Sequence, residues 1–335
     1  MKLEIILIIS NLIFFLVLFY FWKNFIKIVN IYDIPNKRKI HLKKTPLVGG
    51  SIIFLNFFYN FLIFYLLGES YYFYSFLGIE TDKFLYFILI IFLCIFLLGL
   101  FDDKHNIKNS IKSLVLFIFI YLIILSNPTY EITHIKFSNN FTFSIDRFSI
   151  IFTVLSILTL ITIMNLYDGI NLQSGIFFLM NFIFLFFVTK NPLYLCIIAS
   201  LFFFILKNYS SKAFMGDSGI NFLSIVCAIG LLNIYNSSLD LVSFDQILLI
   251  FFLPLVDTVR VFLLRIKKKR SPLSSGKDHF HHFMYSGNNL FFANFVSTFF
   301  LVVAYVIFYL NLNTLYGFII NLTWYFYFFY KQKMK

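Results

Sequence analysis

Long apolar runs separated by short polar segments make up almost the whole chain. Most runs approach the ~20 residues with which an α-helix crosses the hydrocarbon core of a bilayer. The pattern predicts an all-α polytopic membrane protein with about 10–11 transmembrane helices, and we expect residues 1–335 to form one integral membrane domain. No small-residue cleavage site follows the first run, so we expect an uncleaved helix rather than a signal peptide. The predicted helices lie at residues 3–22, 48–68, 84–101, 111–126, 149–167, 172–189, 193–206, 220–236, 245–263, 291–310 and 313–330.

One segment between two apolar runs has a different period. Residues 129–148 alternate apolar and polar positions on both sides of Asn139 and Asn140, as in Phe141 and Phe143. Alternation with a period of two around a pair of turn-forming residues is typical of a hairpin. We therefore predict a small β-hairpin on the extracytoplasmic side of the membrane.

The composition excludes a soluble globular protein. Hydrophobic residues make up 60% of the chain and charged residues 13%, which leaves too few charges to cover a surface in water. Phe alone occurs 51 times, so an aromatic residue at any one position carries little information. The 3 Cys residues lie inside apolar runs without metal-ligand spacing, and we expect no disulfide among them.

The distribution of basic residues predicts the orientation of the chain. With the N-terminus outside and the C-terminus inside, only Lys2, Lys83, Lys136, Arg147 and Lys190 of the 27 Lys and Arg residues lie outside. Basic residues are retained on the cytoplasmic side, which favours this orientation. The net charge of +12 then reflects topology and anionic lipid headgroups, and it needs no nucleic acid partner.

Acidic residues are sorted by the same orientation. Every acidic residue on the inner side is Asp, and all His residues except His134 also lie there. A short carboxylate on a fixed backbone suits a rigid metal or phosphate site better than a solvated surface. We therefore expect any chemistry to face the cytosol. The inner acids are Asp33, Asp102, Asp103, Asp168, Asp217, Asp257 and Asp278.

The first two inner segments carry candidate anion-binding groups. A basic stretch after Asp33 leads to Gly49 and Gly50 at a helix start, where backbone N–H groups can approach an anion. Asp102 and Asp103 end a predicted helix as adjacent carboxylates, which repel each other unless a cation lies near. For each single basic residue a topology signal is the favoured explanation, and a hydrated turn is the alternative for the Asp pair.

The third and fourth inner segments place polar residues at the ends of membrane helices. Asn165, Asp168 and Asn171 join two predicted helices with almost no loop, and polar groups there are costly unless they are used. Asp217 lies between two glycines at a helix N-terminus, a context that suits phosphate or Mg²⁺. Ordinary Asp-Gly and Gly-Asp-Ser-Gly turns are the alternatives.

The fifth inner segment is the most specific. It runs from Asp257 through a basic stretch at 265–270 to the sequence Asp278-His-Phe-His-His282. The three histidines lack the spacing of a tetrahedral zinc site, and no Cys or Glu joins them. Basic residues followed by clustered imidazoles suit a diphosphate better.

Together these segments resemble the polyprenyl-phosphate N-acetylhexosamine-1-phosphate transferases, the superfamily of WecA and MraY. The matching stretches are DIPNKRKIH with PLVGG, GLFDD, NLYDGIN, AFMGDSG and the D-T-V-R…SP…DHFHH block, in the family's order and spacing. The PLVGG and SP…DHFHH forms resemble the WecA branch, which uses UDP-GlcNAc. They resemble less the MraY branch, which uses UDP-MurNAc-pentapeptide.

The chain departs from the family pattern in three places. In the pattern Asp-Gly-x-Asp/Asn-Gly-Leu, Leu172 and Gln173 follow Asn171, so the second Gly is missing. Leu273-Ser-Ser-Gly276 replaces a Phe-Ser-Pro-Asp stretch, and Gly219-Ile-Asn-Phe-Leu-Ser replaces Gly-Ser-x-x-Leu-Gly. These departures bear on the identity of the sugar more than on the reaction.

The resemblance implies transfer of an N-acetylhexosamine-1-phosphate, GlcNAc-1-phosphate first, from a UDP-sugar to undecaprenyl phosphate, with release of UMP. The product would start a lipid-linked cell-envelope polysaccharide such as the O-antigen of lipopolysaccharide. Phospho-MurNAc-pentapeptide transfer in peptidoglycan synthesis is the alternative within the superfamily. The resemblance leaves the assembly open, with a homodimer as one option.

By the same resemblance, Mg²⁺, or Mn²⁺ in its place, is the expected cofactor. Asp217 is its first expected ligand, with Asn165 beside it, since Mg²⁺ keeps several waters and needs few protein ligands. Asp102 and Asp103 join Asp217 as expected catalytic residues where the lipid phosphate arrives, and a covalent route through an Asp stays open. The expected substrate-binding residues are Asp168, Asn171, His279, His281, His282, Arg265, Asn36, Lys44 and Gly49.

A transporter or channel for an anionic solute is the main alternative from another class. Polar residues inside a membrane usually mark such pathways. Here the polar groups gather on one face of the predicted bundle, whereas alternating access needs groups on both sides. The sequence therefore favours the transferase.

Overall fold

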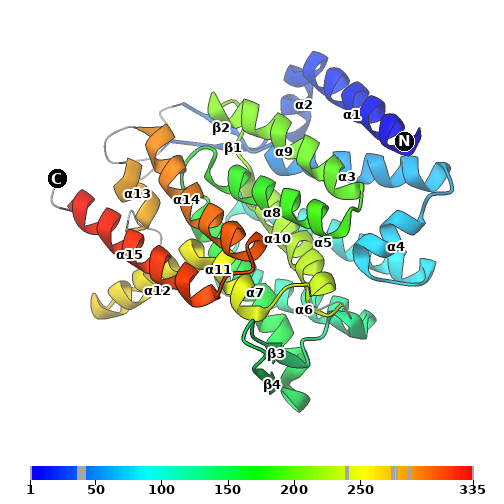
Figure 1. Cartoon of the computed structure of the whole chain (residues 1–335). Helices are drawn as coiled ribbons and strands as arrows, with labels where there is room; N and C mark the ends of the chain where they lie inside the picture. The colour runs from blue at the N-terminus through cyan, green and yellow to red at the C-terminus, as the bar shows by residue number, and fades with distance from the viewer. Residues whose placement is uncertain are drawn as a thin grey trace.

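Helices form most of the molecule in the computed structural model, which describes residues 2–35, 43–237, 241–272, 276, 278–285 and 289–333. Each of the eleven predicted ranges is helical, and the all-α polytopic membrane architecture is confirmed (Figure 1). The helices are α1 (Lys2–Tyr20), α2 (Trp22–Val29), α3 (Gly49–Leu66), α4 (Tyr71–Leu77), α5 (Asp82–His105), α6 (Asn109–Ser126), α7 (Ser149–Tyr167), α8 (Gln173–Thr189), α9 (Leu193–Tyr209), α10 (Gly216–Tyr235), α11 (Phe244–Ile250), α12 (Phe252–Lys267), α13 (Phe280–Tyr285), α14 (Leu290–Tyr309) and α15 (Thr314–Lys333), with short 3₁₀ turns η1 (Pro128–Tyr130) and η2 (Asp146–Phe148).

Not every helix has the length and apolarity of a membrane span. Within the described residues, 6 helices meet both conditions, and up to 8 spans result if each bent helix pair counts as one. The bent pairs are α1 with α2, at 78°, and α11 with α12, at 74°. The apolar helices α8 and α9 have only 17 residues each. By length and composition, the number of full spans is therefore lower than the number of apolar runs.

The run predicted as one helix over residues 245–263 is broken at Phe251, which corrects the prediction. Pro254 lies in the first turn of α12. In a continuous helix the ring of Pro254 would clash with the carbonyl of Ile250, four residues earlier, and its missing N–H would remove a hydrogen bond. The helix therefore ends before the proline and restarts in another direction.

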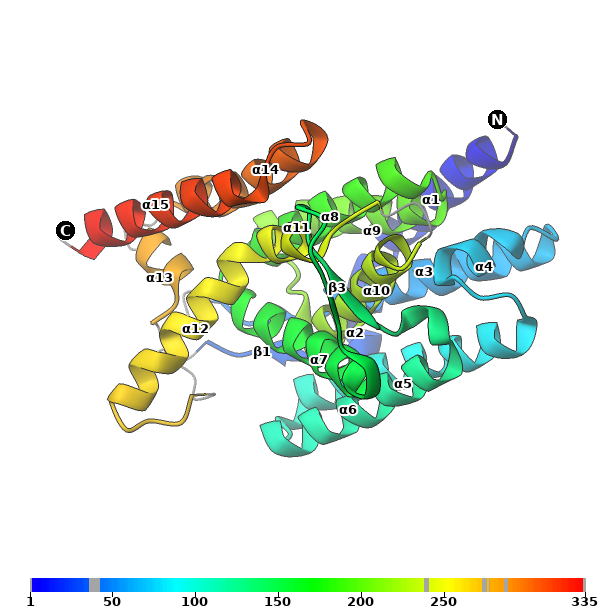
Figure 2. The same cartoon turned by 60° about the horizontal axis from the view of Figure 1, so that its bottom comes forward.

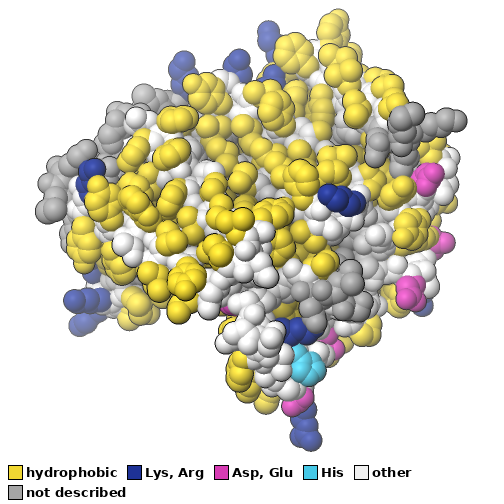
Figure 3. Space-filling model, viewed as in Figure 1, with side chains coloured by type: hydrophobic (Ala, Val, Ile, Leu, Met, Phe, Trp, Pro, Cys, Tyr) yellow, Lys and Arg dark blue, Asp and Glu magenta, His cyan; other side chains and the backbone are white. Residues whose placement is uncertain are grey.

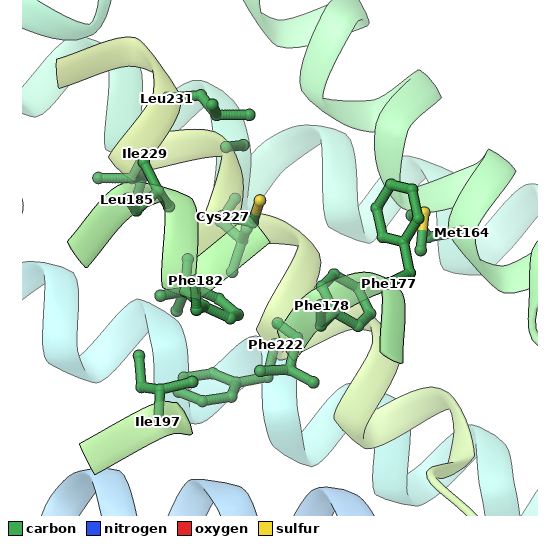
Figure 4. Close-up of a cluster of buried hydrophobic side chains, with 14 of the residues drawn as sticks. Met164, Phe177, Phe178, Phe182, Leu185, Ile197, Phe222, Cys227, Ile229 and Leu231 are labelled. Atoms are coloured by element: carbon green, nitrogen blue, oxygen red, sulfur yellow. The ribbon is translucent and has the colours of Figure 1, made fainter. Parts of the chain in front are cut away.

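Helix α10 lies at the centre of the bundle. Of its 18-residue window, 94% is buried, against 56% or less for the other candidate spans. Figure 4 shows Phe222 and Cys227 of α10 in one apolar cluster with Phe178 and Phe182 of α8. The element that carries Asp217 is thus the most enclosed of the candidate spans among the described residues.

Glycines let α3 and α5 approach the first turn of α10. A Cβ atom on Gly50 of α3 would lie 2.3 Å from the backbone nitrogen of Gly219, and one on Gly99 of α5 would lie 2.4 Å from the Cα of Ser218. No larger residue fits at either contact without moving a helix. The start of α10 is therefore held by close backbone packing.

Two short antiparallel sheets complete the described fold. Strands β1 (Tyr32–Asp33) and β2 (Thr45–Pro46) pair before α3. Strands β3 (His134–Lys136) and β4 (Thr142–Ser144) pair with Ile135 opposite Phe143, which confirms the predicted β-hairpin. The Asp245 carboxylate accepts hydrogen bonds from the Ser138 backbone and hydroxyl, so it fastens the hairpin to α11.

The hairpin and the α5–α6 connection mark opposite ends of the bundle. Helix α6 has 18 residues, about 27 Å at 1.5 Å per residue, and joins one end to the other (Figure 2). Phe19 near the end of α1 contacts Lys207 near the end of α9, whereas Thr314 at the start of α15 contacts Asp245 beneath the hairpin. Helix α1 therefore starts at the hairpin end and α15 starts there too, so the two chain termini lie at opposite ends.

The lateral surface is apolar. Hydrophobic side chains cover most of the face in Figure 3, over α9, α14 and α15, and Lys and Arg side chains lie mostly at its edges. Large side chains of these helices, such as Leu206, Phe291 and Leu315, are more than half exposed. A surface of this kind suits hydrocarbon rather than water.

Candidate functional site

A cavity of about 840 Å³ lies where the inner polar segments meet, at the end of the bundle away from the hairpin. It collects residues from the segment before α3, the α5–α6 and α7–α8 connections, the start of α10 and α13. Segments far apart in the sequence therefore share one site. The predicted site residues that line it are Asp102, Asp103, Asn165, Asp168, Asn171, Asp217 and His282.

Asp103 caps the N-terminus of α10. Its carboxylate accepts hydrogen bonds from the backbone nitrogens of Asp217, at 2.7 Å, and Ser218, at 3.2 Å, and from the Ser218 hydroxyl, at 2.9 Å. The first N–H groups of a helix have no partner within the helix, and a carboxylate also interacts favourably with the helix dipole. Asp103 thereby fixes the backbone from which the Asp217 side chain projects.

Asp102 and Asp217 share one buried lysine. Lys112 in the first turn of α6 lies 2.8 Å from Asp102 Oδ2 and 2.6 Å from Asp217 Oδ2. Asp102 also accepts a hydrogen bond from the backbone nitrogen of Ile107. The Asp217 side chain is 36% exposed and the Asp102 side chain 8%, so Asp217 is the more accessible of the two carboxylates. One cation here offsets the repulsion between two carboxylates.

Asn165 of α7 pairs with a buried asparagine of α10. Its Nδ2 donates to Asn221 Oδ1 at 3.0 Å. Among the described residues, the Oδ1 atom of Asn165 has no hydrogen-bond partner. An amide oxygen of this kind is a suitable ligand for a hard cation.

The α7–α8 connection is a tight polar turn. The Asp168 carboxylate accepts a hydrogen bond from the Ser174 hydroxyl, and Asn171 donates to Ser211. Burial raises the pKa of Asp168 to about 6. Leu172 has φ +73°, which is the left-handed conformation. Gly adopts this conformation freely, and the family pattern has its second Gly at this position. Its backbone nitrogen donates to Asn208, which holds the turn in this strained form.

The histidine-rich segment is held mainly by a buried network. Asp257 of α12 accepts hydrogen bonds from Arg260, Tyr325 and the backbone of Phe280. Its Oδ2 atom also lies 2.9 Å from Nδ1 of His279. Arg260 also donates to the carbonyl of Asp278. This network connects α12, α13 and α15.

Only part of the predicted diphosphate-binding group reaches the cavity. Of the three histidines, His282 is the one that lines it. His281 is buried against the backbone of Gly169, where a Cβ would come within 1.8 Å of its Nε2, and burial lowers its pKa. Arg265 is 1% exposed and donates to the carbonyl of Pro272 instead. Arg265 and His279 therefore do not line the cavity. Their contacts hold the histidine-rich segment in place.

At the start of α3, where an anion site was predicted, the backbone N–H groups form hydrogen bonds within the protein. The backbone nitrogens of Gly49 and Gly50 donate to the carbonyls of Phe214 and Met215 at 2.9 Å. These N–H groups are therefore engaged, and the glycines instead bring α3 against α10. Lys44 lies over the ring of Tyr32, a cavity residue, at 3.9 Å. The predicted contribution of Asn36 lies outside the described residues.

The donor set of the cavity fits Mg²⁺ better than zinc. Within the described part of the chain, no group of three His, Cys, Asp or Glu side chains is arranged to hold a metal. Mg²⁺ differs from zinc in that it usually keeps several waters and binds one or two carboxylates. The partly exposed Asp217 carboxylate and the unpartnered Asn165 Oδ1 meet that requirement.

A second, apolar groove of about 380 Å³ lies between α7, α10, α11 and α12. Its lining includes Leu160 and Ile163 of α7, Leu231 of α10 and Phe251 at the α11–α12 bend. Helices α7 and α10 thus contribute to both the polar cavity and the apolar groove. A hydrocarbon chain fits such a lining.

Comparison with known proteins agrees with this arrangement. Residues 84–235, from α5 to α10, match the model of the family described as Glycosyl transferase family 4. The matched segment carries Asp102, Asp103, Asn165, Asp168 and Asp217, and it covers less than half of the chain. No curated protein matched the chain. The match supports a membrane transferase that acts on polyprenyl phosphate at the level of this family, without specifying the sugar.

Sequence reasoning missed three residues at the site. The distribution of basic residues explains Lys112 as a topology signal, although a Lys inside an apolar run is itself an indication of use. Asn221 and Ser218 gave no signal, because their roles depend on which residues of other helices face them.

Proposed function

We propose that the protein transfers an N-acetylhexosamine-1-phosphate, GlcNAc-1-phosphate first, from a UDP-sugar to undecaprenyl phosphate, and releases UMP. The observation that carries this proposal is that Asp102 and Asp217 line one cavity, built largely from the matched segment, and that Lys112 bridges the two carboxylates. The chain acts as a single domain in a bacterial inner membrane, with the cavity toward the cytosol. The product starts a lipid-linked polysaccharide of the cell envelope.

In this proposal Asp217 and Asn165 hold Mg²⁺, or Mn²⁺ in its place. The bound ion supplies Lewis-acid stabilisation of the donor diphosphate. Asp103 keeps Asp217 in position by capping α10, and both of its oxygens are engaged in that task. Of the adjacent carboxylates, Asp102 is therefore the one left to act beside the lipid phosphate.

The lipid phosphate attacks the β-phosphorus of the donor. A phosphate oxygen forms the new P–O bond, and the bond to the UMP oxygen breaks. The second pKa of a phosphate monoester is roughly 6, so the attacking group is already ionised at neutral pH and needs little help from a base. Lys112, which pairs with Asp217, and His282, which lines the cavity, would offset the negative charge of the phosphates. Asp102 orients Lys112.

The apolar groove supports a lipid acceptor. It takes part of the polyprenyl chain between α7, α10 and the bent α11–α12 pair, while the phosphate reaches the polar cavity on the same two helices. A soluble acceptor has no use for such a groove. Phe251, at the 74° bend between α11 and α12, is one of the residues that line the groove.

The donor is proposed to be UDP-GlcNAc or a close N-acetylated relative. Asp168 and Asn171 line the cavity and are placed to bind the nucleotide or sugar. The PLVGG and DHFHH forms resemble the WecA branch. UDP-FucNAc and UDP-QuiNAc are further candidate donors, because the chain departs from the family pattern. A few hydrogen bonds to sugar hydroxyls decide the selectivity among such donors.

The test is transfer by the purified protein in lipid nanodiscs. UDP-GlcNAc, UDP-FucNAc, UDP-QuiNAc and UDP-MurNAc-pentapeptide compete in one reaction with undecaprenyl phosphate and Mg²⁺. We expect UMP and a lipid-linked HexNAc that depend on both the lipid and the ion. A preference for the pentapeptide donor would move the chain to the MraY branch. Uptake of an anionic solute by proteoliposomes, without UMP release from any donor, would favour the transporter.

A further inference from the structure

The pair formed by Asn165 and Asn221 leaves two amide atoms unused. Asn165 Nδ2 donates to Asn221 Oδ1 at 3.0 Å, across the contact between α7 and α10. Asn221 is fully buried, at 0% exposure. Among the described residues, Asn165 Oδ1 and Asn221 Nδ2 have no hydrogen-bond partner. Unpartnered buried amide atoms are costly, and Asn165 also lines the polar cavity, where a ligand can meet its free oxygen.

Asn221 is also tied to the cavity through its own helix. It follows Asp217 by four residues in α10, so the two side chains lie on the same face, one turn apart. Asp217 and Asn165 both line the cavity. One helix thus supplies a cavity carboxylate in its first turn and, one turn deeper, the acceptor that holds Asn165.

We propose that Asn221 is a positioning residue for the divalent-cation site. Because its Oδ1 accepts the hydrogen bond from Asn165 Nδ2, the Asn165 amide is fixed with its own Oδ1 left for the cation beside Asp217. The inference rests on the proposed function for the two cation ligands and adds a residue that touches neither cation nor substrate. Partners behind a ligand set its orientation and thereby its affinity for the metal.

This role belongs to the present chain rather than to the pattern of the superfamily. In the stretch Gly219-Ile-Asn-Phe-Leu-Ser, Asn221 occupies a position that the pattern Gly-Ser-x-x-Leu-Gly leaves open. An apolar residue there would leave Asn165 Nδ2 without its acceptor. The amide could then rotate, and the cation would lose a fixed ligand.

Asn181 of α8 provides a matched control. It is also fully buried, its Nδ2 donates one hydrogen bond, to the carbonyl of Phe177 in its own helix, and its Oδ1 has no partner among the described residues. It does not line the cavity. Replacing it with Leu therefore makes the same chemical change without touching Asn165.

The experiment measures Mn²⁺ binding by electron paramagnetic resonance on purified protein, without donor or lipid phosphate. We expect Asn221→Leu to weaken Mn²⁺ binding by about 10- to 100-fold. Asn221→Asp keeps an acceptor for Asn165 and should bind at least as tightly as the wild type. Asn181→Leu should bind like the wild type. In turnover assays, Asn221→Leu should need more Mg²⁺ for half-maximal rate while keeping most of its rate at saturating Mg²⁺.

Unchanged Mn²⁺ affinity in Asn221→Leu, or an equal loss in Asn181→Leu, would overturn the inference. If Asn221→Leu does not fold, Asn221→Ala takes its place: weaker Mn²⁺ binding in Asn221→Ala with retained binding in Asn221→Asp supports the role, and equal binding in both overturns it. Wild-type protein that binds Mn²⁺ but transfers no sugar phosphate would contradict the proposed function, while the effect of Asn221→Leu on Mn²⁺ would still support the positioning role. Wild-type protein that transfers sugar phosphate but holds no Mn²⁺ at this site would overturn the positioning role alone.

Discussion

The ammonium group of Lys112 lies 2.6 Å from the Asp217 carboxylate, although 105 residues separate them in the chain. The same ammonium lies 2.8 Å from Asp102, so one lysine is shared by the carboxylates of two motifs. A divalent cation at Asp217 would replace part of this interaction. Lys112 would then be available for the negative charge of a substrate phosphate.

Replacing Lys112 with Met should separate metal binding from turnover. Loss of a positive charge beside two carboxylates should keep Mn²⁺ affinity or tighten it, because the cation no longer competes with the ammonium. Turnover should fall by about 100-fold, since a group that stabilises phosphate charge is gone. Mn²⁺ binding and UMP release, measured on the same preparation, check both expectations.

Lys108→Met is the control for that variant. Lys108 is exposed, does not line the cavity and immediately precedes α6, the helix that carries Lys112. It should keep wild-type activity. Equal activity of Lys112→Met and the wild type would remove Lys112 from the site.

Asp217→Asn should abolish Mg²⁺-dependent turnover and leave the fold intact. The Asn side chain keeps the shape but not the charge, so the expected effect is a loss of at least about 100-fold in turnover together with weaker Mn²⁺ binding. Thermal unfolding in detergent should remain near the wild-type temperature, because Asp103 still caps α10. Retention of most activity would move the metal site to Asp102.

Much of this architecture could be predicted because it depends on local patterns. Apolar runs gave the positions of the helices, and period-two alternation around Asn139 gave the β-hairpin. The order of the polar segments gave the residues of the cavity, since each segment ends or starts a helix on the same side. Those features need only the chain's own periodicity and the thickness of a bilayer.

What the sequence could not give are the partners of individual side chains. Asp102 and Asp103 are neighbours in α5, but successive residues of a helix point about 100° apart, so one meets Lys112 and the other caps α10. Gly49 looked like an anion site and serves packing instead. Arg265 is charged yet buried, because the carbonyl of Pro272 and neighbouring groups satisfy it. These outcomes depend on contacts between distant segments.

The orientation of the bundle leads to a labelling prediction. The cavity and the β-hairpin lie at opposite ends, so Lys108→Cys and Arg270→Cys should face the cytosol and Asn139→Cys the outside. The background is a chain without Cys94, Cys196 and Cys227. In intact cells a membrane-impermeant maleimide should label only Asn139→Cys. Labelling of Lys108→Cys alone would put the cavity outside, where a cytosolic UDP-sugar cannot reach it.

The left-handed residue in the α7–α8 turn gives a prediction about stability. Leu172 has φ +73°, and its side chain is only half-buried, so the strain of that conformation is not offset by deep packing. A left-handed conformation costs an L-residue roughly 1–2 kcal/mol, whereas Gly adopts it freely. Leu172→Gly should therefore be more stable than Leu172→Ala, the reverse of the usual order of Gly and Ala.

Thermal unfolding of both variants in the same detergent tests this order. The Ala variant loses the Leu contacts and keeps the strain, while the Gly variant loses the same contacts and relieves it. The backbone nitrogen at position 172 should still donate to Asn208 in both. An unfolding temperature that is higher for Leu172→Ala would show that the turn does not hold this residue in the left-handed region. In that case the missing glycine of the family pattern would have no structural consequence at this position.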